Sequence, residues 1–489
     1  MKGNPMQKRL MLLLLTLVVR MLFTKTLPED ESLKSSILLF ETWLKAKMEY
    51  RGIPGCSFAV VYDQELVYSN GYGYCDVEEK APAAAITVYR IASITKTFTS
   101  TAIMQLRDAG KLRLDDPIRK YLPWVDIQAE FEKEPEITIW HLLTHTSGLP
   151  GEAAFPYWTD HKFPTKEKII ATLPEQEMLY PTGTKWHYSN LAMTLLGYII
   201  ENVSGQSYDK YIENNLLIPL NMHNTCVDIS KNKKLIKTLA TAYGRRLPDG
   251  SHELMPFTDS KGLTPAANMS STVEDLAKWA SFQFNGKAAD GTQLLKPATL
   301  REMHRVHWLQ PDWESGWGLG WAVRKKGERT IVGHGGWVAG YRTEISFCPA
   351  EKTAFIIMFN ADDAAPAEYI YKAFELIAPA LVDAFRIEKE IVEPVPDSLW
   401  HIYVGKYRDP WYWDSDVLIL DGKLMIYSYD YPPENNPKYN LSELTPIGQH
   451  TFRIADKNGF GPKVIFKLDQ AGNVRCFKKN ENYNYRVKE

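Results

Sequence analysis

Ser93 and Lys96 stand three residues apart in the stretch RIASITKTFTSTAIMQL, just before an apolar-periodic segment. On a helix this spacing places both side chains on one face, so that the lysine can accept the proton of the serine hydroxyl. A serine at a helix start also lies in the positive field of the helix dipole. The lysine is a base only when neutral, and burial or nearby cations lower its pKa. A serine N-cap followed by an exposed lysine fits the same residues, so this segment alone leaves both interpretations open.

The Ser-x-x-Lys pattern occurs twice more, at Ser207–Lys210 and at Ser230–Lys233. The first copy opens SYDKYIENNL, which is typical of a capped surface helix with an acid beside the lysine. The second copy lies in ISKNKKLIK, a polar run that we expect to be solvated. Neither copy precedes an apolar-periodic helix, which favours Ser93 as the nucleophile.

A second motif, HYSN, contains Tyr188 and Asn190 between a Pro- and Gly-containing loop and a predicted helix. A phenol can act as acid or base if cations lower its pKa, and an amide can orient a substrate carbonyl or a lysine. The same YSN triplet occurs at 68–70 inside a predicted strand, where ordinary cross-strand pairing explains it. The second copy is the better candidate because catalytic groups concentrate on loops held by a scaffold.

A third motif is VGHGGWVAGY, with His334, Gly335, Gly336 and Trp337. Glycines within a strand indicate close approach of the backbone to something else. A substrate that lies along the strand edge would explain them, and a backbone N–H would then lie near the attacked carbonyl. A glycine-kinked strand with a bulge is the alternative.

Two elements at the beginning of the chain would position the first motif. A helix is expected at about 32–50, followed by a hairpin over 55–76 that turns at Asp63-Gln64. The helix that carries Ser93 should run to Gly110, which suits a left-handed C-cap.

Residues 115–310 read as mostly helical and rich in loops, and strands return afterwards. Turns are expected at Lys326-Gly327 and Pro349-Ala350, and a helix at about 365–387. The simplest assembly is α+β: one antiparallel sheet built from both ends of the first 385 residues, flanked by helices, with a helical subdomain and a cleft between them.

A second, smaller domain is expected after a linker at 386–398 that contains acids and prolines. Residues 399–489 show short alternating strands with hairpin signals at Asp421-Gly422 and 471–473. These features predict a small all-β barrel, since closure removes exposed edges. This part of the chain holds no candidate nucleophile–base pair.

The N-terminal segment 1–30 differs from the rest, because basic residues precede the apolar run Leu10–Val19. It suits a secretory signal peptide or an uncleaved signal-anchor, with an organelle presequence as a further alternative. We therefore expect a secreted or membrane-anchored protein with its body outside the cytoplasm, or one in an organelle lumen. The net charge of −2 gives no electrostatic reason to expect nucleic acid.

Metal and disulfide chemistry receive little support. His141 and His145 are spaced i, i+4, but no third ligand accompanies them, so we expect structural roles, and neither a metal nor another cofactor is predicted. The five cysteines are too scattered for a disulfide scaffold. Cys56 and Cys75 bracket the predicted hairpin and could pair, but free thiols are expected.

The three motifs appear in order, with about 95 and 146 residues between them, and longer stretches accompany them: YRIASITKTFTS, ITIWHLLTHTSGLP, YPTGTKWHYSNLAMTLLGYIIENVSG and the run from GLGW to GHGG. Over about 36–385 the chain resembles the serine β-lactamase-like family. The likeness is to the class C β-lactamase branch, which includes D-aminopeptidases, D-alanyl-D-alanine carboxypeptidases and family VIII esterases. The C-terminal part resembles the lipocalin-like β-barrel domain of many members.

The resemblance implies a role for each motif. Ser93 would be the acylated nucleophile, and Lys96 and Tyr188 would share general acid and base work. Asn190 would contact the acyl side chain or Lys96. The backbone N–H groups of Ser93 and Trp337 would form the oxyanion hole.

His334-Gly335-Gly336 occupies the place where β-lactamases carry Lys-Thr-Gly. A neutral histidine binds a carboxylate poorly, so this departure disfavours lactamase or carboxypeptidase activity and favours an ester or a neutral amide. The expected function is therefore a serine hydrolase that forms an acyl-enzyme with a small-molecule or peptide substrate. Esters, D-amino-acid peptides and lactams are candidates in falling order.

Two points stay open. The protein could instead be a catalytically weak, penicillin-recognising fold that serves as a binding or self-assembling scaffold, and its oligomeric state is not set by the sequence. The aromatic segments 156–163 and 307–317 could line an acyl pocket or simply cover the cleft.

Overall fold

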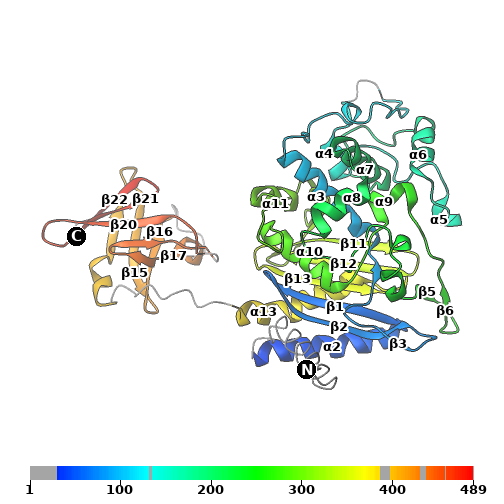
Figure 1. Ribbon diagram of the computed structural model, residues 1–489. Helices are drawn as coiled ribbons and strands as arrows, with labels where there is room; N and C mark the ends of the chain where they lie inside the picture. Colours follow the sequence, from blue (N-terminus) through cyan, green and yellow to red (C-terminus); the bar gives the residue numbers. More distant parts are fainter. Residues whose placement is uncertain (1–29, 132–134, 386–396, 430–436, 457–458, 488–489) are drawn as a thin grey trace, which may run out of the picture. The chain divides into compact units, whose positions relative to one another are not determined.

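The computed structural model describes residues 30–131, 135–385, 397–429, 437–456 and 459–487 (Figure 1). The predicted leader lies outside these residues except for its last position, and so does most of the predicted linker. The chain divides into two compact units, one up to residue 386 and one from residue 387 onward. Each unit is described by itself.

The larger unit is built on a nine-stranded antiparallel sheet in the order β3-β2-β1-β13-β12-β11-β10-β9-β8. Its strands are β1 (Gly55–Tyr62), β2 (Glu65–Asp76), β3 (Ala81–Pro82), β8 (Trp308–Leu309), β9 (Ser315–Trp317), β10 (Ala322–Lys326), β11 (Arg329–Val338), β12 (Tyr341–Cys348) and β13 (Thr353–Phe359). β1 pairs with β13, with Cys56 opposite Phe359 and Tyr62 opposite Thr353. The predicted sheet from both ends of this part of the chain is therefore confirmed.

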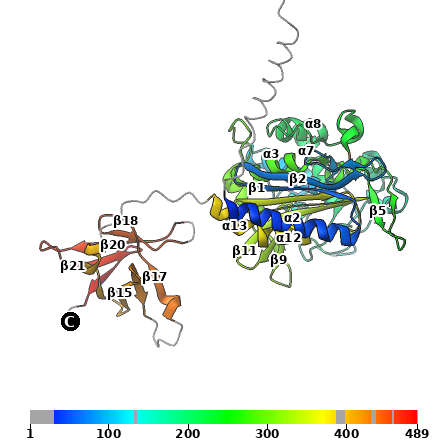
Figure 2. The same ribbon diagram turned by 90° about the horizontal axis from the view of Figure 1, so that it is seen from below.

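Each face of the sheet has its own core, because successive residues of a strand point to opposite sides. In β1, Phe58 and Val60 pack in one core, whereas Ala59 and Val61 pack in the other. The first core is covered by α2 (Glu31–Arg51), α12 (Pro366–Leu376) and α13 (Ala378–Ala384), which lie together on one side of the sheet (Figure 2). α10 (Val273–Asn285) and the helical subdomain cover the other face.

The helical subdomain surrounds α3 (Thr95–Asp108), which packs against α7 (Asn190–Ser204) and α9 (Thr264–Ala267). The other helices are α4 (Ile139–Thr144), α5 (Tyr157–Asp160), α6 (Lys166–Thr172), α8 (Tyr208–Ile212) and α11 (Pro297–His304). Two short strand pairs complete this part: β4 (Tyr89–Arg90) with β7 (Ser270–Ser271), and β5 (Tyr243–Arg246) with β6 (His252–Leu254). Gly110 follows α3 with φ +71°, the left-handed conformation predicted for it.

The prediction of a single helix at about 365–387 is wrong, because two helices occupy this stretch. α12 ends at Leu376, and α13 begins at Ala378 with Pro379 in its first turn. Proline lacks a backbone N–H and cannot continue a helix from the preceding turn, but it is tolerated at a helix start. One helix therefore ends here and a second helix begins.

The smaller unit is a nearly closed, nine-stranded antiparallel barrel, as predicted, in the order β17-β16-β15-β14-β22-β21-β20-β19-β18. Its strands are β14 (Gly405–Arg408), β15 (Asp414–Leu420), β16 (Lys423–Ser428), β17 (Leu441–Glu443), β18 (Thr445–Gly448), β19 (Thr451–Arg453), β20 (Lys463–Leu468), β21 (Val474–Lys479) and β22 (Asn482–Arg486). Buried aromatic residues, among them Tyr407, Phe466 and Phe477, fill its interior.

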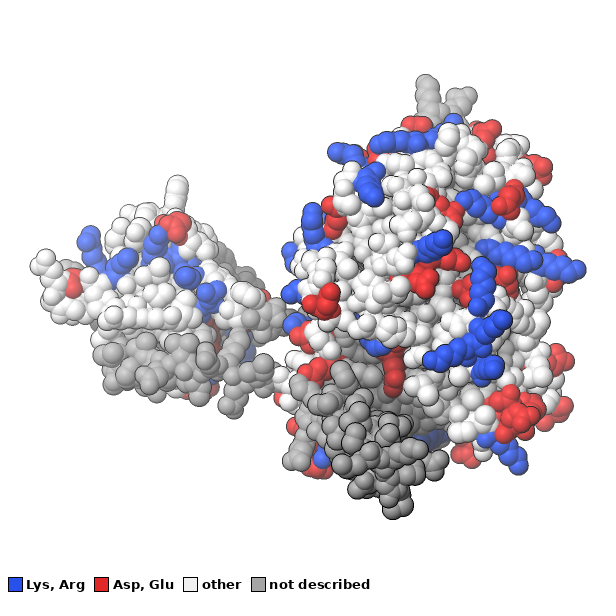
Figure 3. Space-filling model, viewed as in Figure 1, with Lys and Arg blue, Asp and Glu red and all other residues white. Residues whose placement is uncertain are grey.

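Several global features bear on function. On the face of the larger unit shown in Figure 3, basic and acidic side chains are interspersed. All five cysteines are free, so Cys56 and Cys75 do not pair. Within the described residues, no helix combines the length and apolar character that a membrane span requires.

Candidate active site

Ser93 lies in a single 3₁₀ turn, Ala92–Ile94, that leads directly into α3. Ala92 has φ +45°, a left-handed conformation that is costly for a residue with a Cβ atom. The turn is tied to a neighbouring segment, because Ile91 N–H donates to the Met269 carbonyl at 2.9 Å and Met269 N–H donates to Thr95 Oγ1 at 3.1 Å. Strain of this kind persists only where surrounding contacts hold it, and such sites are often functional.

Lys96 is fully buried, and its Nζ lies 3.0 Å from Ser93 Oγ. Nζ also donates to Asn190 Oδ1 at 2.7 Å and to the Ala266 carbonyl at 2.8 Å. These two partners are oxygens without a proton, so they can only accept hydrogen bonds. In the neutral amine they take both N–H groups, which leaves the nitrogen lone pair for the hydroxyl of Ser93.

Burial lowers the pKa of Lys96 to about 7, and the charge of Glu152 opposes this shift. The charged form is disfavoured because the ammonium loses its hydration. A lysine with an ordinary pKa would be almost entirely protonated at neutral pH. Lys96 can therefore act as a base at neutral pH.

Tyr188 completes the group around Ser93. Lys96 Nζ lies 4.9 Å from the centre of the Tyr188 ring, and Tyr188 lines the same pocket as Ser93. The ring of His145 lies 4.5 Å from the Tyr188 ring. Burial raises the pKa of Tyr188 despite the opposing effect of Ser93, so the lowering by cations that the sequence analysis required does not occur. Tyr188 is a protonated phenol at neutral pH.

Glu152 is a member of the site that the sequence analysis missed. Asn190 Nδ2 donates to Glu152 Oε1 at 2.7 Å, while Asn190 Oδ1 accepts from Lys96. Tyr157 also donates its hydroxyl to Glu152. Glu152 thereby fixes the orientation of the Asn190 amide and, through it, of Lys96. It lies in the loop after α4, where no periodic pattern singles it out.

β11 supplies the remaining predicted residues. β10 pairs only with Arg329–Gly333, whereas β12 pairs with β11 up to Val338. The described strands therefore leave 334–338 unpaired on one side, as a bound extended substrate would require. A Cβ on Gly336 would lie 2.2 Å from the Ile91 carbonyl oxygen, so the close approach that this glycine permits is to the turn that carries Ser93.

His334 is buried and neutral. Burial and the charge of Lys96 lower its pKa to about 3. Its Nδ1 donates to the Gly335 carbonyl at 2.7 Å, which leaves the buried Nε2 as an acceptor without a protein partner. His334 therefore offers no positive charge for a substrate carboxylate. Trp337 follows, with its indole N–H donating to Asp362 at 2.8 Å.

These residues border one pocket of about 1080 Å³, which we call the active-site pocket. Its lining includes Ser93, Tyr188, Asn190, His334, Gly336 and Trp337. Lys96 lies behind Ser93 and is not part of the surface. The two aromatic segments also contribute, with Trp158 and His161 from one and Trp317 from the other.

The other sequence candidates have structural roles. Ser207 precedes α8 without capping it through its side chain, and exposed Ser230 donates to Asp228. Tyr68 donates to Glu41 at 2.5 Å and accepts from Asn70 at 3.0 Å.

The histidine pair does not form a metal site. His141 forms a capping box with Thr138, and His145 Nδ1 accepts from Ser189 N–H at 3.1 Å. Within the described residues, no group of three or more His, Cys, Asp or Glu side chains could hold a metal ion.

The comparisons with known proteins agree with this geometry. The beta-lactamase family model matches residues 40–376. Protein flp of Staphylococcus aureus (strain MRSA252) is 29% identical over 343 residues, which are 70% of this chain and 66% of that protein. The chain thus spans just under two thirds of the length of this curated relative.

Two solved structures are similar. The octameric penicillin-binding protein homologue from Pyrococcus abyssi has a TM-score of 0.61 at 25% identity and covers 92% of this chain and 100% of its own. The D-stereospecific amidohydrolase from Streptomyces sp. has a TM-score of 0.57 at 25% identity, with 68% and 97% covered. With a family model that matches more than half of its residues, the chain belongs to the beta-lactamase family, a family of serine hydrolases.

Proposed function

We propose that the protein hydrolyses esters or neutral amides through an acyl-enzyme on Ser93. One observation carries the proposal: the buried Lys96 amine lies 3.0 Å from the Ser93 hydroxyl, and its two other contacts are acceptors only. This arrangement is what a serine nucleophile needs, since a base must lie within hydrogen-bond reach of its proton.

The residues divide the proton transfers between them. Neutral Lys96 takes the Ser93 proton as Oγ forms a bond to the substrate carbonyl carbon. The backbone N–H groups of Ser93 and Trp337 stabilise the oxyanion. Tyr188, a phenol at neutral pH, gives its proton to the leaving group and regains one from the Lys96 ammonium. A water molecule then forms a bond to the acyl carbonyl carbon as Lys96 takes its proton. The bond between this carbon and Ser93 Oγ breaks, and the Lys96 ammonium returns the proton to Oγ.

The neutral His334 supports esters and neutral amides as the substrate class. Without a positive charge at this position, the site lacks the lysine that would pair with the carboxylate of a lactam or of a peptide C-terminus. Arg324 and Arg342 also line the pocket, and Arg342 donates from Nε to the Asp362 carbonyl and lies over the Trp337 ring. The D-stereospecific amidohydrolase among the similar structures supports amides of D-amino acids as a second substrate type.

Replacement of the nucleophile tests the proposal. Ser93→Ala should abolish both the burst of p-nitrophenol from p-nitrophenyl acetate and the mass increase after reaction with a fluorophosphonate. Ser207→Ala, in another Ser-x-x-Lys pattern, is the matched control and should keep both. An unchanged burst in Ser93→Ala would refute the assignment.

The scaffold alternative rests on the octameric penicillin-binding protein homologue. If this chain assembles in the same way, multi-angle light scattering of the full chain gives a mass several times that of the monomer. Fluorophosphonate labelling of every subunit would show that such an assembly is also catalytic. A particle that takes up no label would favour the scaffold function over hydrolysis.

A further inference from the structure

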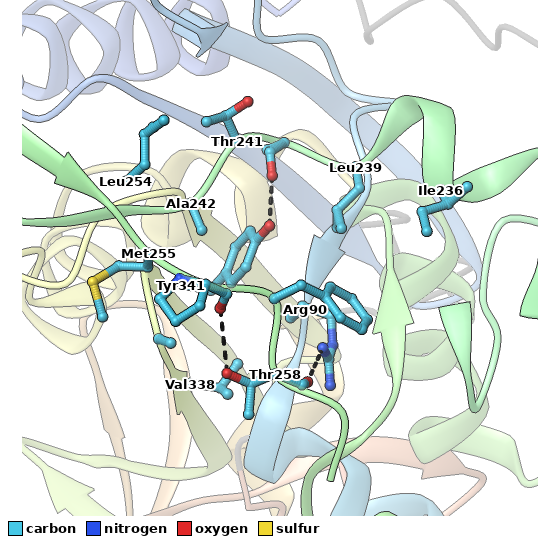
Figure 4. A pocket seen from close by; sticks show the side chains of 14 residues that line it. Arg90, Ile236, Leu239, Thr241, Ala242, Leu254, Met255, Thr258, Val338 and Tyr341 are labelled. Atoms are coloured by element: carbon cyan, nitrogen blue, oxygen red, sulfur yellow. Dashed lines mark hydrogen bonds between the residues drawn. The ribbon is translucent and has the colours of Figure 1, made fainter. Parts of the chain in front are cut away.

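A second hollow, the side pocket, has a volume of about 280 Å³, and Figure 4 shows the side chains that line it. Apolar side chains make up most of its lining, among them Ile236, Leu239, Leu254, Met255 and Val338. The proposed mechanism uses none of them.

The side pocket and the active-site pocket share walls. Met255, Thr258 and Ala339 line both of them. Ala339 lies two residues after Trp337, and Arg90, which also lines the side pocket, lies three residues before Ser93. The side pocket is thus bordered by the segments that flank both proposed oxyanion donors, and it shares three lining residues with the pocket that contains Ser93.

The polar groups of the side pocket are turned into its walls. Arg90, only 2% exposed, donates to the Thr258 carbonyl at 2.5 Å and to Asn268 Oδ1 at 2.9 Å. The hydroxyl of Tyr341 donates to the Ala240 carbonyl at 2.5 Å (Figure 4). The guanidinium of Arg90 lies 5.1 Å from the centre of the Phe257 ring. These contacts engage much of the polar wall, although the buried Arg90 Nε has no hydrogen-bond partner, and the side chains that complete the lining are mostly apolar.

Exposed apolar side chains surround the side pocket. Ile236 is 39% exposed, Phe257 49% and Leu254 60%. A cluster of exposed apolar residues around a hollow, beside a pocket that holds a candidate nucleophile, is a mark of a binding site. An occupant with a long apolar chain would remove these side chains from water.

We propose that the side pocket binds the hydrocarbon chain of an ester whose carbonyl is held at Ser93, so that the preferred substrates are esters with medium-length apolar chains. This inference rests on the proposed hydrolase function. The chain can belong to the acyl group or to the alcohol, and the experiment separates the two. Each CH₂ group that enters the pocket should raise kcat/KM by about fourfold.

Two ester series on the full-length protein test this inference: p-nitrophenyl esters of acetic, butyric, hexanoic and octanoic acid, and acetate esters of the matching straight-chain alcohols. We expect kcat/KM to rise with chain length in one series. Ile236→Glu should remove that rise while the acetyl ester, too short to reach the side pocket, is hydrolysed as before. Leu247→Glu is the matched control, since Leu247 is also 39% exposed but does not line the pocket.

The outcomes distinguish the two proposals. Acetate esters could be hydrolysed in a Ser93-dependent way while kcat/KM does not rise with chain length in either series. This result overturns the proposal for the side pocket and leaves the proposed hydrolase function intact. An equal loss in Ile236→Glu and Leu247→Glu also overturns it. If no ester is hydrolysed in a Ser93-dependent way, the proposed function itself is overturned. If Ile236→Glu loses activity on the acetyl ester, Leu254→Glu takes its place, because Leu254 is more exposed.

Discussion

Lys96 gives the site a defined pH dependence at the scale of single residues. Its neutral form is the base and its pKa is about 7, so raising the pH removes a proton and creates the active form. We expect kcat/KM for p-nitrophenyl acetate to rise with pH through about 7 and to level off above it. His334, one of the two histidines that line the pocket, titrates far below this range.

The effect of Glu344 titration on this pH profile must be distinguished from the effect of Lys96 titration. It also lines the active-site pocket, and burial raises its pKa to about 7. Glu344→Gln should leave the rise in place if Lys96 causes it. A rise that disappears in Glu344→Gln, or a flat profile in the unmodified protein, would contradict the assignment of the base.

Glu152 should tune this pH dependence as a positioning residue. Its negative charge raises the pKa of Lys96, so Glu152→Gln should move the rise in kcat/KM to lower pH. The glutamine retains an oxygen that can accept from Asn190 Nδ2, so the orientation of the amide is preserved. A pH–rate profile checks the shift, and a lower rate with an unmoved profile would indicate only a packing role.

The residues of the site differ in how far sequence could reveal them. Ser93, Lys96, Tyr188 and Asn190 stand in short patterns with a chemical meaning, and the structure brings them together. Glu152 carries no such pattern, because it meets Asn190 from a loop 38 residues away in sequence. Contacts of this kind depend on the path of the loop, which local propensity does not determine.

Gly336 shows, at the scale of elements, why β11 needs glycine. In Gly336→Ala the new Cβ would meet the Ile91 carbonyl oxygen at 2.2 Å and Thr343 Oγ1 at 2.4 Å. Because backbone atoms cannot give way, we expect unfolding to require about 1–3 kcal/mol less free energy, as overpacked cores do. Urea unfolding measures this value. In Gly335→Ala the contact is the carboxylate end of Glu344, so its loss of stability should be smaller.

Most elements could be predicted because their signals are local. The hairpin of β1 and β2 has its polar turn at Asp63, whose φ of +49° suits an aspartate, and the buried positions of α2 recur every three or four residues. The break between α12 and α13 was missed although Pro379 is visible in the sequence. A proline can begin a helix as well as end one, and only the packing of both helices on the sheet decides the matter.

At the scale of the whole molecule, we expect the larger unit to keep its hydrolytic activity when the barrel is removed. All residues that line the active-site pocket lie between Ser93 and Ala367, in the larger compact unit. A chain that ends after residue 385 should therefore hydrolyse p-nitrophenyl acetate with a kcat/KM within about twofold of the full chain. Circular dichroism establishes that the shortened chain is folded. A folded but inactive product would assign the barrel a part in catalysis.

The pairing of β1 with β13 also has a consequence for biosynthesis. β1 leaves the ribosome about 300 residues before its partner strand is translated, so its apolar edge stays uncovered for most of elongation. An uncovered edge invites pairing with other nascent chains. A chain that ends before β13 would therefore keep this edge of β1 unpaired, and we expect such a fragment to aggregate.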